Sequence, residues 1–320
     1  MSSIYCDLDD LVRLRFKARS LQLFNKAASK SLLSGGILSP FKGRGIDFEE
    51  VRAYQPGDDI RSIDWRVTAR RSKPHTKIFR EERERPVLIL LDQSHSLFFG
   101  SQLNFKSVTA CEAASMVGWA TLFNKDRVGG ILFNEQEVYN IRPKSSKQTL
   151  MHFLKQAEKI NKRLTLDAMP ASPPEGYMAK ALRHAKRVAH PGTQLFIVSD
   201  FKNMDSDATR LLSQLKRHCE IMALHVSDPL ERELPKPGNY VITNGVHRYA
   251  IDTRKHAQRQ RFRNQQQEQV EKLRNTLREL RIPHLSLCTS ENTAEQLLFM
   301  LSARKPHRNT GGSHGSNLSS

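Results

Sequence analysis

The clearest pattern along the chain is a continuous apolar run that ends in an acid. Residues 86–91 are apolar throughout and are followed by Asp92, and residues 195–198 form a second apolar run shortly before Asp200. Continuous apolarity over this length is typical of strands that are buried on both faces, as in a parallel sheet. Strand and helix patterns alternate around these runs, which predicts a doubly wound, mainly parallel α/β domain over residues 86–303.

The spacing of apolar positions predicts the other elements of this domain. Strands are expected at 126–133, 137–141, 220–226 and 283–288, and a hairpin at 240–251 around the turn-forming pair Asn244-Gly245. Helices are expected at 105–123, 146–160, 177–189, 205–217, 254–281 and 294–302.

The first 85 residues have a different character. Residues 1–34 carry leucines at roughly helical spacing and predict an N-terminal helical segment. Residues 35–85 predict a region of turns and β-structure, because glycines interrupt its start and Pro56-Gly57 favours a tight turn. At the other end, residues 304–320 are rich in Gly, Ser and Asn and are predicted to be disordered.

Composition narrows the class of protein. The chain has 320 residues, of which 38% are hydrophobic, which suffices for one large core. No apolar run approaches the ~20 residues that cross a membrane, and the first residues do not form a signal peptide. The four cysteines include no CxxC pair, which disfavours a structural zinc site and suits a reducing compartment. We therefore expect a soluble, cytoplasmic protein.

The formal net charge of +18 has two interpretations. It favours an acidic partner, whether nucleic acid, an anionic membrane surface or an acidic protein, or it is a solvated basic surface. The densest basic stretch, residues 254–281, holds nine Lys and Arg against three Glu and includes one aromatic residue, Phe262. This composition disfavours a platform on which nucleic-acid bases stack.

The two strand-end acids are the strongest candidates for a functional site. Asp92, Ser94 and Ser96 follow one strand and Asp200 follows another, and ligands bind at the carboxyl ends of the strands in open α/β sheets. Carboxylates and hydroxyls are hard oxygen donors that suit Mg²⁺, Mn²⁺ or Ca²⁺. The alternative is that each acid only caps the helix that follows its strand.

The run Asp92-Gln93-Ser94-His95-Ser96 resembles the first motif of the metal-ion-dependent adhesion site in von Willebrand factor type A domains. The resemblance implies that Asp92, Ser94 and Ser96 hold a divalent ion, and that Asp200 is the aspartate of the third motif. It also implies a threonine from a second loop. Here Gly176 or a neighbour aligns with that threonine, and Ser172 is a candidate substitute. His95 lies at a position whose side chain usually points away from the ion.

Residues 43–70, GRGIDFEEVRAYQPGDDIRSIDWRVTAR, closely resemble the signature of the domain-of-unknown-function 58 family. The resemblance continues over most of residues 10–303. It implies a chaperone-like adaptor that acts with a MoxR-type AAA+ ATPase and its client proteins. Many members of the family carry two N-terminal membrane helices. The chain has no such segments and resembles a soluble branch of the family.

The signature also has a physical interpretation. Its arginines alternate with aspartates, and an arginine fork matches a carboxylate with two hydrogen bonds, so these residues are expected to lock a turn-rich small domain. Tyr54 and Trp65 are expected to be apolar anchors. The alternative is a docking surface for a partner. The residues singled out are Arg52, Tyr54, Gly57, Asp58, Arg61, Asp64, Trp65 and Arg70.

These features favour a binding module over an enzyme. The chain has no histidine pair at metal-ligand spacing, no G-x-S-x-G nucleophile elbow and no G-x-x-x-x-G-K-[ST] phosphate loop. The leading hypothesis is a non-enzymatic module that offers the strand-end edge, with or without Mg²⁺, to an acidic group on a partner. Two alternatives are nucleic-acid binding through residues 254–281 and the tail, and Mg²⁺-dependent phosphoryl transfer by Asp92 and Asp200.

Overall fold

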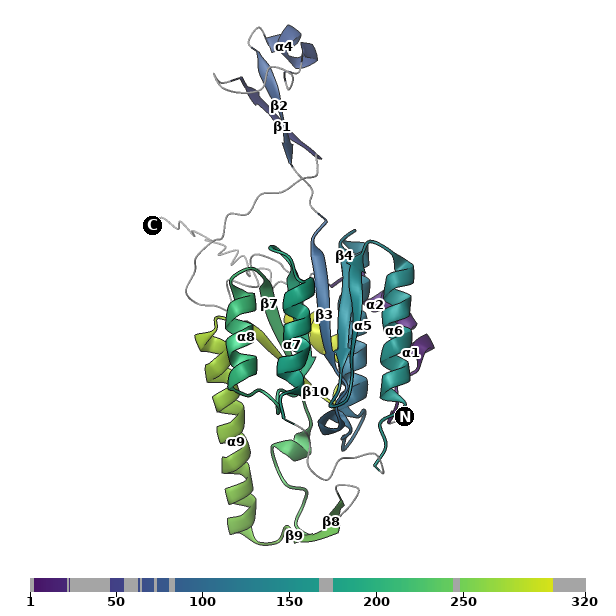
Figure 1. Ribbon diagram of the computed structural model, residues 1–320, viewed down its shortest axis with the longest axis vertical. Helices are drawn as coiled ribbons and strands as arrows, with labels where there is room; N and C mark the ends of the chain where they lie inside the picture. The colour runs from purple at the N-terminus through teal and green to yellow at the C-terminus, as the bar shows by residue number, and fades with distance from the viewer. Residues whose placement is uncertain are drawn as a thin grey trace, which may run out of the picture.

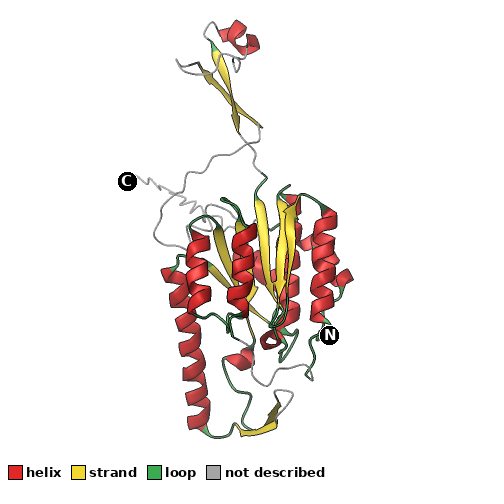
Figure 2. Ribbon diagram, in the orientation of Figure 1, coloured by secondary structure: helices red, strands yellow, loops and turns green. Residues whose placement is uncertain are grey.

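A computed structural model of the protein describes residues 3–21, 23, 47–54, 63, 65–71, 74–80, 84–166, 175–243 and 248–301. Its centre is a six-stranded sheet with helices on both faces (Figures 1 and 2). The strand order is β10-β7-β6-β3-β4-β5, and β5 alone runs antiparallel to its neighbour. The predicted doubly wound, mainly parallel α/β class is confirmed. The strands are β3 (Pro86–Asp92), β4 (Arg127–Phe133), β5 (Val138–Lys144), β6 (Gln194–Ser199), β7 (Glu220–Ser227) and β10 (His284–Cys288).

The side chains of β3 show why its sequence is apolar throughout. Val87, Ile89 and Leu91 belong to a core on one face of the sheet, and Leu88 and Leu90 belong to a second core on the other face. Successive side chains of a strand point to opposite faces, so a strand covered on both sides must be apolar at every position.

Two sets of helices cover the two faces. The first face carries α5 (Lys106–Phe123), α6 (Lys147–Asn161) and α10 (Thr293–Leu301). The second carries α7 (Tyr177–Val188), α8 (Ser206–Lys216) and the last turns of α9 (His256–Glu279). The α5 helix is buried on nearly every side rather than along one stripe, because the sheet and other helices surround it.

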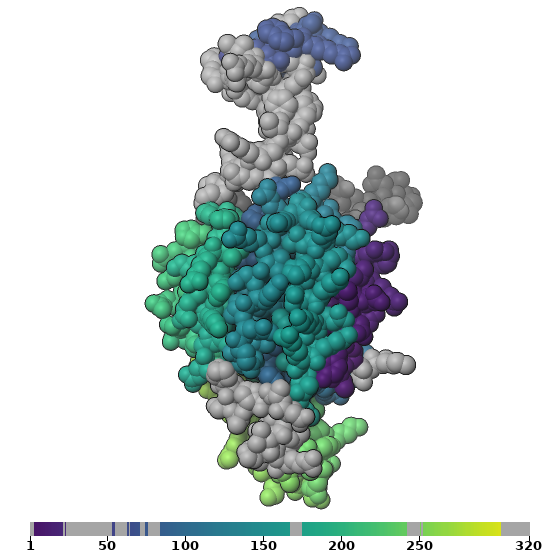
Figure 3. Space-filling view, turned by 45° about the vertical axis from the view of Figure 1, so that its right-hand side comes forward, coloured from purple at the N-terminus to yellow at the C-terminus, as the bar shows by residue number. Residues whose placement is uncertain are grey.

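The N-terminal segment packs onto the first face. It forms two short helices, α1 (Leu8–Arg13) and α2 (Arg15–Ala18), and Leu11 and Ala18 are buried in the first core. The carbonyl of Leu11 accepts hydrogen bonds from Ser115 and Trp119 of α5. In Figure 3 the N-terminal segment, in purple, lies directly against the teal part of the molecular surface.

The signature region includes a small β-hairpin and a short helix. Strands β1 (Asp47–Ala53) and β2 (His75–Arg80) pair antiparallel, and α4 (Trp65–Arg71) lies between them in sequence. Arg52 is in β1 and Arg70 is on α4, whereas Gly57, Asp58, Arg61 and Asp64 lie outside the described residues. Tyr54 is half-buried, and its N–H donates to the carbonyl of Pro74.

Trp65 does not act as the apolar anchor that its size suggested. It is 69% exposed at the start of α4.

The elements beyond β7 match the predicted pattern. The short helix η3 (Pro229–Glu231) follows β7, and β8 (Asn239–Thr243) pairs antiparallel with β9 (Arg248–Asp252) in the predicted hairpin. None of the described helices is long and apolar enough to cross a membrane.

Candidate functional site at the carboxyl edge of the sheet

The two strand-end acids lie at the same edge of the sheet. Asp92 is the last residue of β3, and Asp200 directly follows β6. The two strands are parallel neighbours in which Leu91 pairs with Val198, so both strands end at the same level of the sheet. This is the carboxyl edge, where the fold places ligand sites.

Asp92 is completely enclosed by its own loop and by β6. Its Oδ1 accepts a hydrogen bond from the Ser94 N–H at 2.9 Å, and its Oδ2 accepts one from the Ser199 hydroxyl at 2.6 Å. Burial, and then the nearby charge of Asp200, raise the pKa of Asp92 to about 7. The carboxyl is therefore poised between its neutral and charged forms near neutral pH.

The two serines of the run lie beside each other. The hydroxyls of Ser94 and Ser96 are 3.1 Å apart. Tyr177 is the first residue of α7, and its hydroxyl donates a hydrogen bond to the Ser94 Oγ at 3.4 Å. Gly176 caps that helix with a left-handed backbone (φ 76°) that suits glycine. A phenol therefore contacts Ser94 close to where the resemblance expects a threonine, and Ser172 lies outside the described residues.

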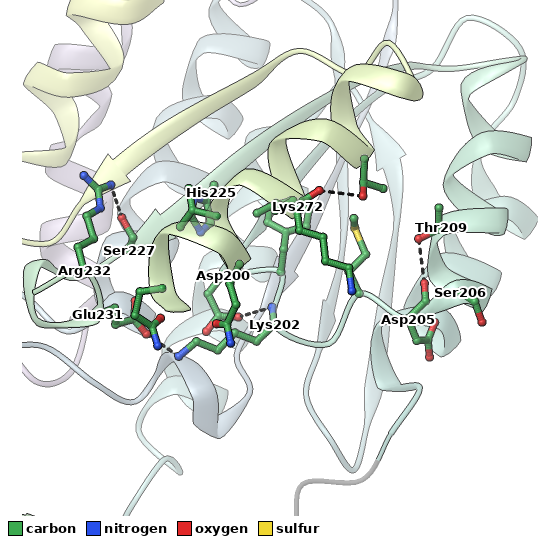
Figure 4. A pocket seen from close by; sticks show the side chains of 17 residues that line it. Asp200, Lys202, Asp205, Ser206, Thr209, His225, Ser227, Glu231, Arg232 and Lys272 are labelled. Atoms are coloured by element: carbon green, nitrogen blue, oxygen red, sulfur yellow. Dashed lines mark hydrogen bonds and ion pairs between the residues drawn. The ribbon is translucent and has the colours of Figure 1, made fainter. Parts of the chain in front are cut away.

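Asp200 has a cationic partner within the protein. The ammonium of Lys106, the first residue of α5, is 2.8 Å from the Asp200 Oδ2 and 2.7 Å from the Glu231 Oε1. The Lys202 ammonium reaches the same oxygen of Glu231 from the solvent side. Figure 4 shows Asp200, Lys202 and Glu231 gathered at one end of the pocket described below. We call Lys106, Asp200, Lys202 and Glu231 the ion-pair cluster.

The charges of the ion-pair cluster balance, because it contains two cations and two acids. Burial alone raises the pKa of Asp200, but the charges of Lys106 and Lys202 outweigh it and lower that pKa to about 2. Burial alone lowers the pKa of Lys106, and the charges of Asp200 and Glu231 outweigh it and raise that pKa. Each group thus holds its partner in the charged form.

His95 is held by the carboxylate of Glu135. Its backbone N–H donates to Glu135 Oε1 at 2.8 Å, and its Nδ1 lies 3.3 Å from Glu135 Oε2. Glu135 follows β4, the neighbour of β3 on the other side. The pair holds the loop after β3 in place.

The donors present fit a divalent ion poorly. Asp92, Ser94 and Ser96 come together as the resemblance implies, but the carboxylate of Asp200 is occupied by the Lys106 ammonium. Within the described part of the chain, no cluster of three or more His, Cys, Asp or Glu side chains is arranged to hold a metal. A divalent cation that joined Asp200 would also lie close to a buried positive charge.

An open pocket of about 690 Å³ adjoins the ion-pair cluster. It lies between the ends of β6 and β7 and the facing sides of α8 and α9 (Figure 4). Its acids are buried or engaged, since Asp205 caps α8 through the N–H of Ala208. Its cations face the solvent: Lys202, Arg232 and Lys272.

Sequence reasoning did not identify Lys106, Glu231, Ser199 or Tyr177 as site residues. Lys106 contacts Asp200, and it lies only fourteen positions beyond Asp92 in the sequence. One signal was available, since Lys106 begins a helix of small and apolar residues. A lysine that becomes fully buried at such a position needs a carboxylate partner.

These observations define a doubly wound α/β protein with a charge-balanced polar site at the carboxyl edge of its sheet. The chain belongs to the family described as "Protein of unknown function DUF58", whose model matches residues 50–272.

Two proteins from curated collections illustrate the range of similarity. An uncharacterized protein of Mycobacterium tuberculosis, Rv1480, is 28% identical over 305 residues, which cover 93% of this chain and 92% of that protein. The uncharacterized protein YeaD of Bacillus subtilis is 44% identical over 46 residues, or 14% of this chain and 12% of that protein.

Two solved structures are also similar. A conserved hypothetical protein BatB from Bacteroides thetaiotaomicron is 14% identical with a TM-score of 0.39, and the match covers 68% of this chain and all of that one. A von Willebrand factor type A protein from Catenulispora acidiphila is 11% identical with a TM-score of 0.31, over 48% of this chain and 35% of that one.

Proposed function

We propose that this protein is a non-enzymatic interaction module that binds an acidic segment of a MoxR-type AAA+ ATPase and acts in the cytoplasm as its adaptor. The contact is made at the carboxyl edge of the sheet, over the pocket between α8 and α9. One observation carries the proposal: Asp200 and Glu231 are ion-paired and Asp205 caps α8, whereas Arg232 and Lys272 are exposed and have no ion pair with another described residue. An incoming group therefore meets positive charge.

The burial of the strand-end groups favours binding over catalysis. The Ser199 hydroxyl donates to Asp92, which is the kind of contact that could activate a nucleophile. Both side chains are completely buried, however, so no substrate reaches them. Ser94 has Ser96 and Tyr177 as hydrogen-bond partners instead of a base.

The charge of the whole chain supports the same partner chemistry. A net charge of +18 attracts an acidic surface over a distance and raises the rate of encounter. Lys202 is 52% exposed and Lys272 is exposed on α9, so both can contact a carboxylate without leaving the surface.

The test measures binding of the purified MoxR-type ATPase from the same organism to immobilised protein by interferometry. The variant Lys202→Ala/Lys272→Glu is expected to weaken binding roughly tenfold, mainly through a slower association rate that depends less on salt. The control Lys155→Ala/Lys147→Glu changes exposed lysines of α6, on the opposite face of the sheet, and is expected to change affinity less than about twofold.

Two results would contradict the proposal, and they can be told apart. If the wild-type protein does not bind the ATPase, the partner is wrong. If both double variants lose affinity equally, the carboxyl edge is not the contact. The two double variants should have the same melting temperature as the wild type, which confirms that each protein is folded when its binding is measured.

A further inference from the structure

The most unusual group in the molecule is the ammonium of Lys106. Its side chain is 0% exposed, and it lies between the carboxylates of Asp200 and Glu231 at 2.8 and 2.7 Å. A fully buried lysine is rare, because removing an ammonium from water is costly unless carboxylates replace the lost hydration. This lysine therefore requires carboxylate partners, which Asp200 after β6 and Glu231 on η3 supply together.

The oxygens of the strand-end acids are all in use. Asp200 accepts from the Lys106 ammonium at Oδ2 and from the Lys202 N–H at Oδ1. Asp92 accepts from the Ser94 N–H at Oδ1 and from the Ser199 hydroxyl at Oδ2. A divalent ion that approached these oxygens would compete with the Lys106 ammonium for Asp200 and would be repelled by its charge.

We propose that the Lys106 ammonium takes the place of a divalent ion at the carboxyl edge, so that the site is held together without a bound metal. The lysine supplies the positive charge that Asp200, which follows β6, and Glu231, on η3, require. It also joins the start of α5 to the residue that follows β6 and to η3. This inference concerns the isolated chain and does not rest on the proposed partner.

The same cluster explains why the lysine is at this position. The Lys106 N–H donates to the carbonyl of Phe99 at 2.7 Å, which anchors the start of α5 against the loop that follows β3. Glu231 is itself fixed, because its Oε2 accepts from the N–H of Asp228 in the cap of η3. Both ends of the ion pair are therefore preorganised, and little conformational entropy is lost when it forms.

The test compares two lysines that each join two carboxylates. Lys162 is 2.7 Å from Asp7 and 2.9 Å from Glu158, but its side chain is 46% exposed. Lys106→Met is expected to lower the melting temperature by on the order of 10 °C, because it leaves two buried acids without a cation. Lys162→Met is the matched control and is expected to lower it by less than about 3 °C.

Manganese is then added to each protein. Mn²⁺ is expected to leave the melting temperatures of the wild type and Lys162→Met unchanged and to raise that of Lys106→Met in a saturable way, because the freed acids become ligands for the ion. Calorimetric titration of the wild type is expected to show no stoichiometric Mn²⁺ binding.

The proposal is overturned if the wild-type protein binds one Mn²⁺ and Ser96→Ala weakens that binding. This measurement needs no variant of Lys106, so it remains decisive if Lys106→Met does not fold. The proposal is also overturned if Lys106→Met folds with an unchanged melting temperature, since the ammonium would then not be required by the acids around it.

Discussion

The cost of removing a charge from the carboxyl edge can be worked out in advance for Asp200→Asn. This change keeps the shape of the side chain and removes the negative charge that lies 2.8 Å from the Lys106 ammonium. Removing one partner of a buried ion pair typically costs about 3–5 kcal/mol. Glu231 remains beside Lys106 and keeps part of the attraction, so the lower end of that range is expected.

The pKa of Asp200 reflects the same ion pair and changes in the same direction. The fold lowers it from 3.8 to about 2, although burial alone would raise it, because Lys106 and Lys202 stabilise the charged form. A shift of this size corresponds to about 2–3 kcal/mol of stability at neutral pH. The carboxylate contributes this stability above pH 3.8, and the contribution is lost as the pH falls towards 2.

A surface aspartate with two cationic partners is the matched comparison. Asp207 pairs with Arg183 at 3.1 Å and with Arg210 at 3.0 Å, but its side chain is 47% exposed. Solvent screens such pairs, so Asp207→Asn is expected to cost less than about 1 kcal/mol. The two variants have the same chemical change and differ in burial, and the exposed Asp207 has one ion pair more than the buried Asp200.

Urea unfolding at pH 7.5, followed by circular dichroism, measures both variants. Asp200→Asn is expected to lower the free energy of unfolding by about 3 kcal/mol, with a clearly lower midpoint, and Asp207→Asn to leave the midpoint close to that of the wild type. If the two variants lose the same amount of stability, burial does not set the strength of the ion-pair cluster and the reasoning is refuted.

Two further predictions follow from other buried positions. Burial lowers the pKa of His225 to about 4, so the fold disfavours its protonated form, and stability should be lost as the pH falls from 6.5 towards 4. Between pH 7.5 and 5.0 this one residue should account for a loss of about 2 kcal/mol in the free energy of unfolding. The variant His225→Gln should therefore lose less stability than the wild type over this pH range in urea unfolding. An identical loss in both proteins would contradict the prediction. Gly130→Ala places a methyl group against the Phe153 ring and 2.9 Å from the Ile89 carbonyl oxygen. The variant should lower the free energy of unfolding by about 1–3 kcal/mol. An unchanged thermal midpoint would show that the ring moves aside freely.

The hydrophobic pattern alone was sufficient to predict the framework of the sheet. The apolar run at 195–198 lies within β6 (Gln194–Ser199), and the predicted helix at 254–281 is α9 at His256–Glu279. Strands covered on both faces are apolar at every position, and long helices carry a periodic stripe where they pack, so local sequence is enough to recognise both.

The signature region was harder to interpret from residue types. Tryptophan is usually at least partly buried, so Trp65 was expected to be an anchor, and the structure exposes it on α4. A short helix offers few positions that face a neighbour, and which residues occupy them depends on where the helix docks. That placement is a property of the tertiary structure.

The sequence by itself determined that two acids follow buried strands and that both belong to the type of sheet edge where ligands bind. It could not determine what balances their charge. Lys106 is fourteen positions after Asp92, and Glu231 is more than a hundred positions further on, so nothing in their spacing indicates that they meet. Strand order and the packing of α5 bring the carboxylates of Asp200 and Glu231 within 2.8 and 2.7 Å of the Lys106 ammonium. Electrostatic partners are decided by distance in space, and only the tertiary structure supplies that distance.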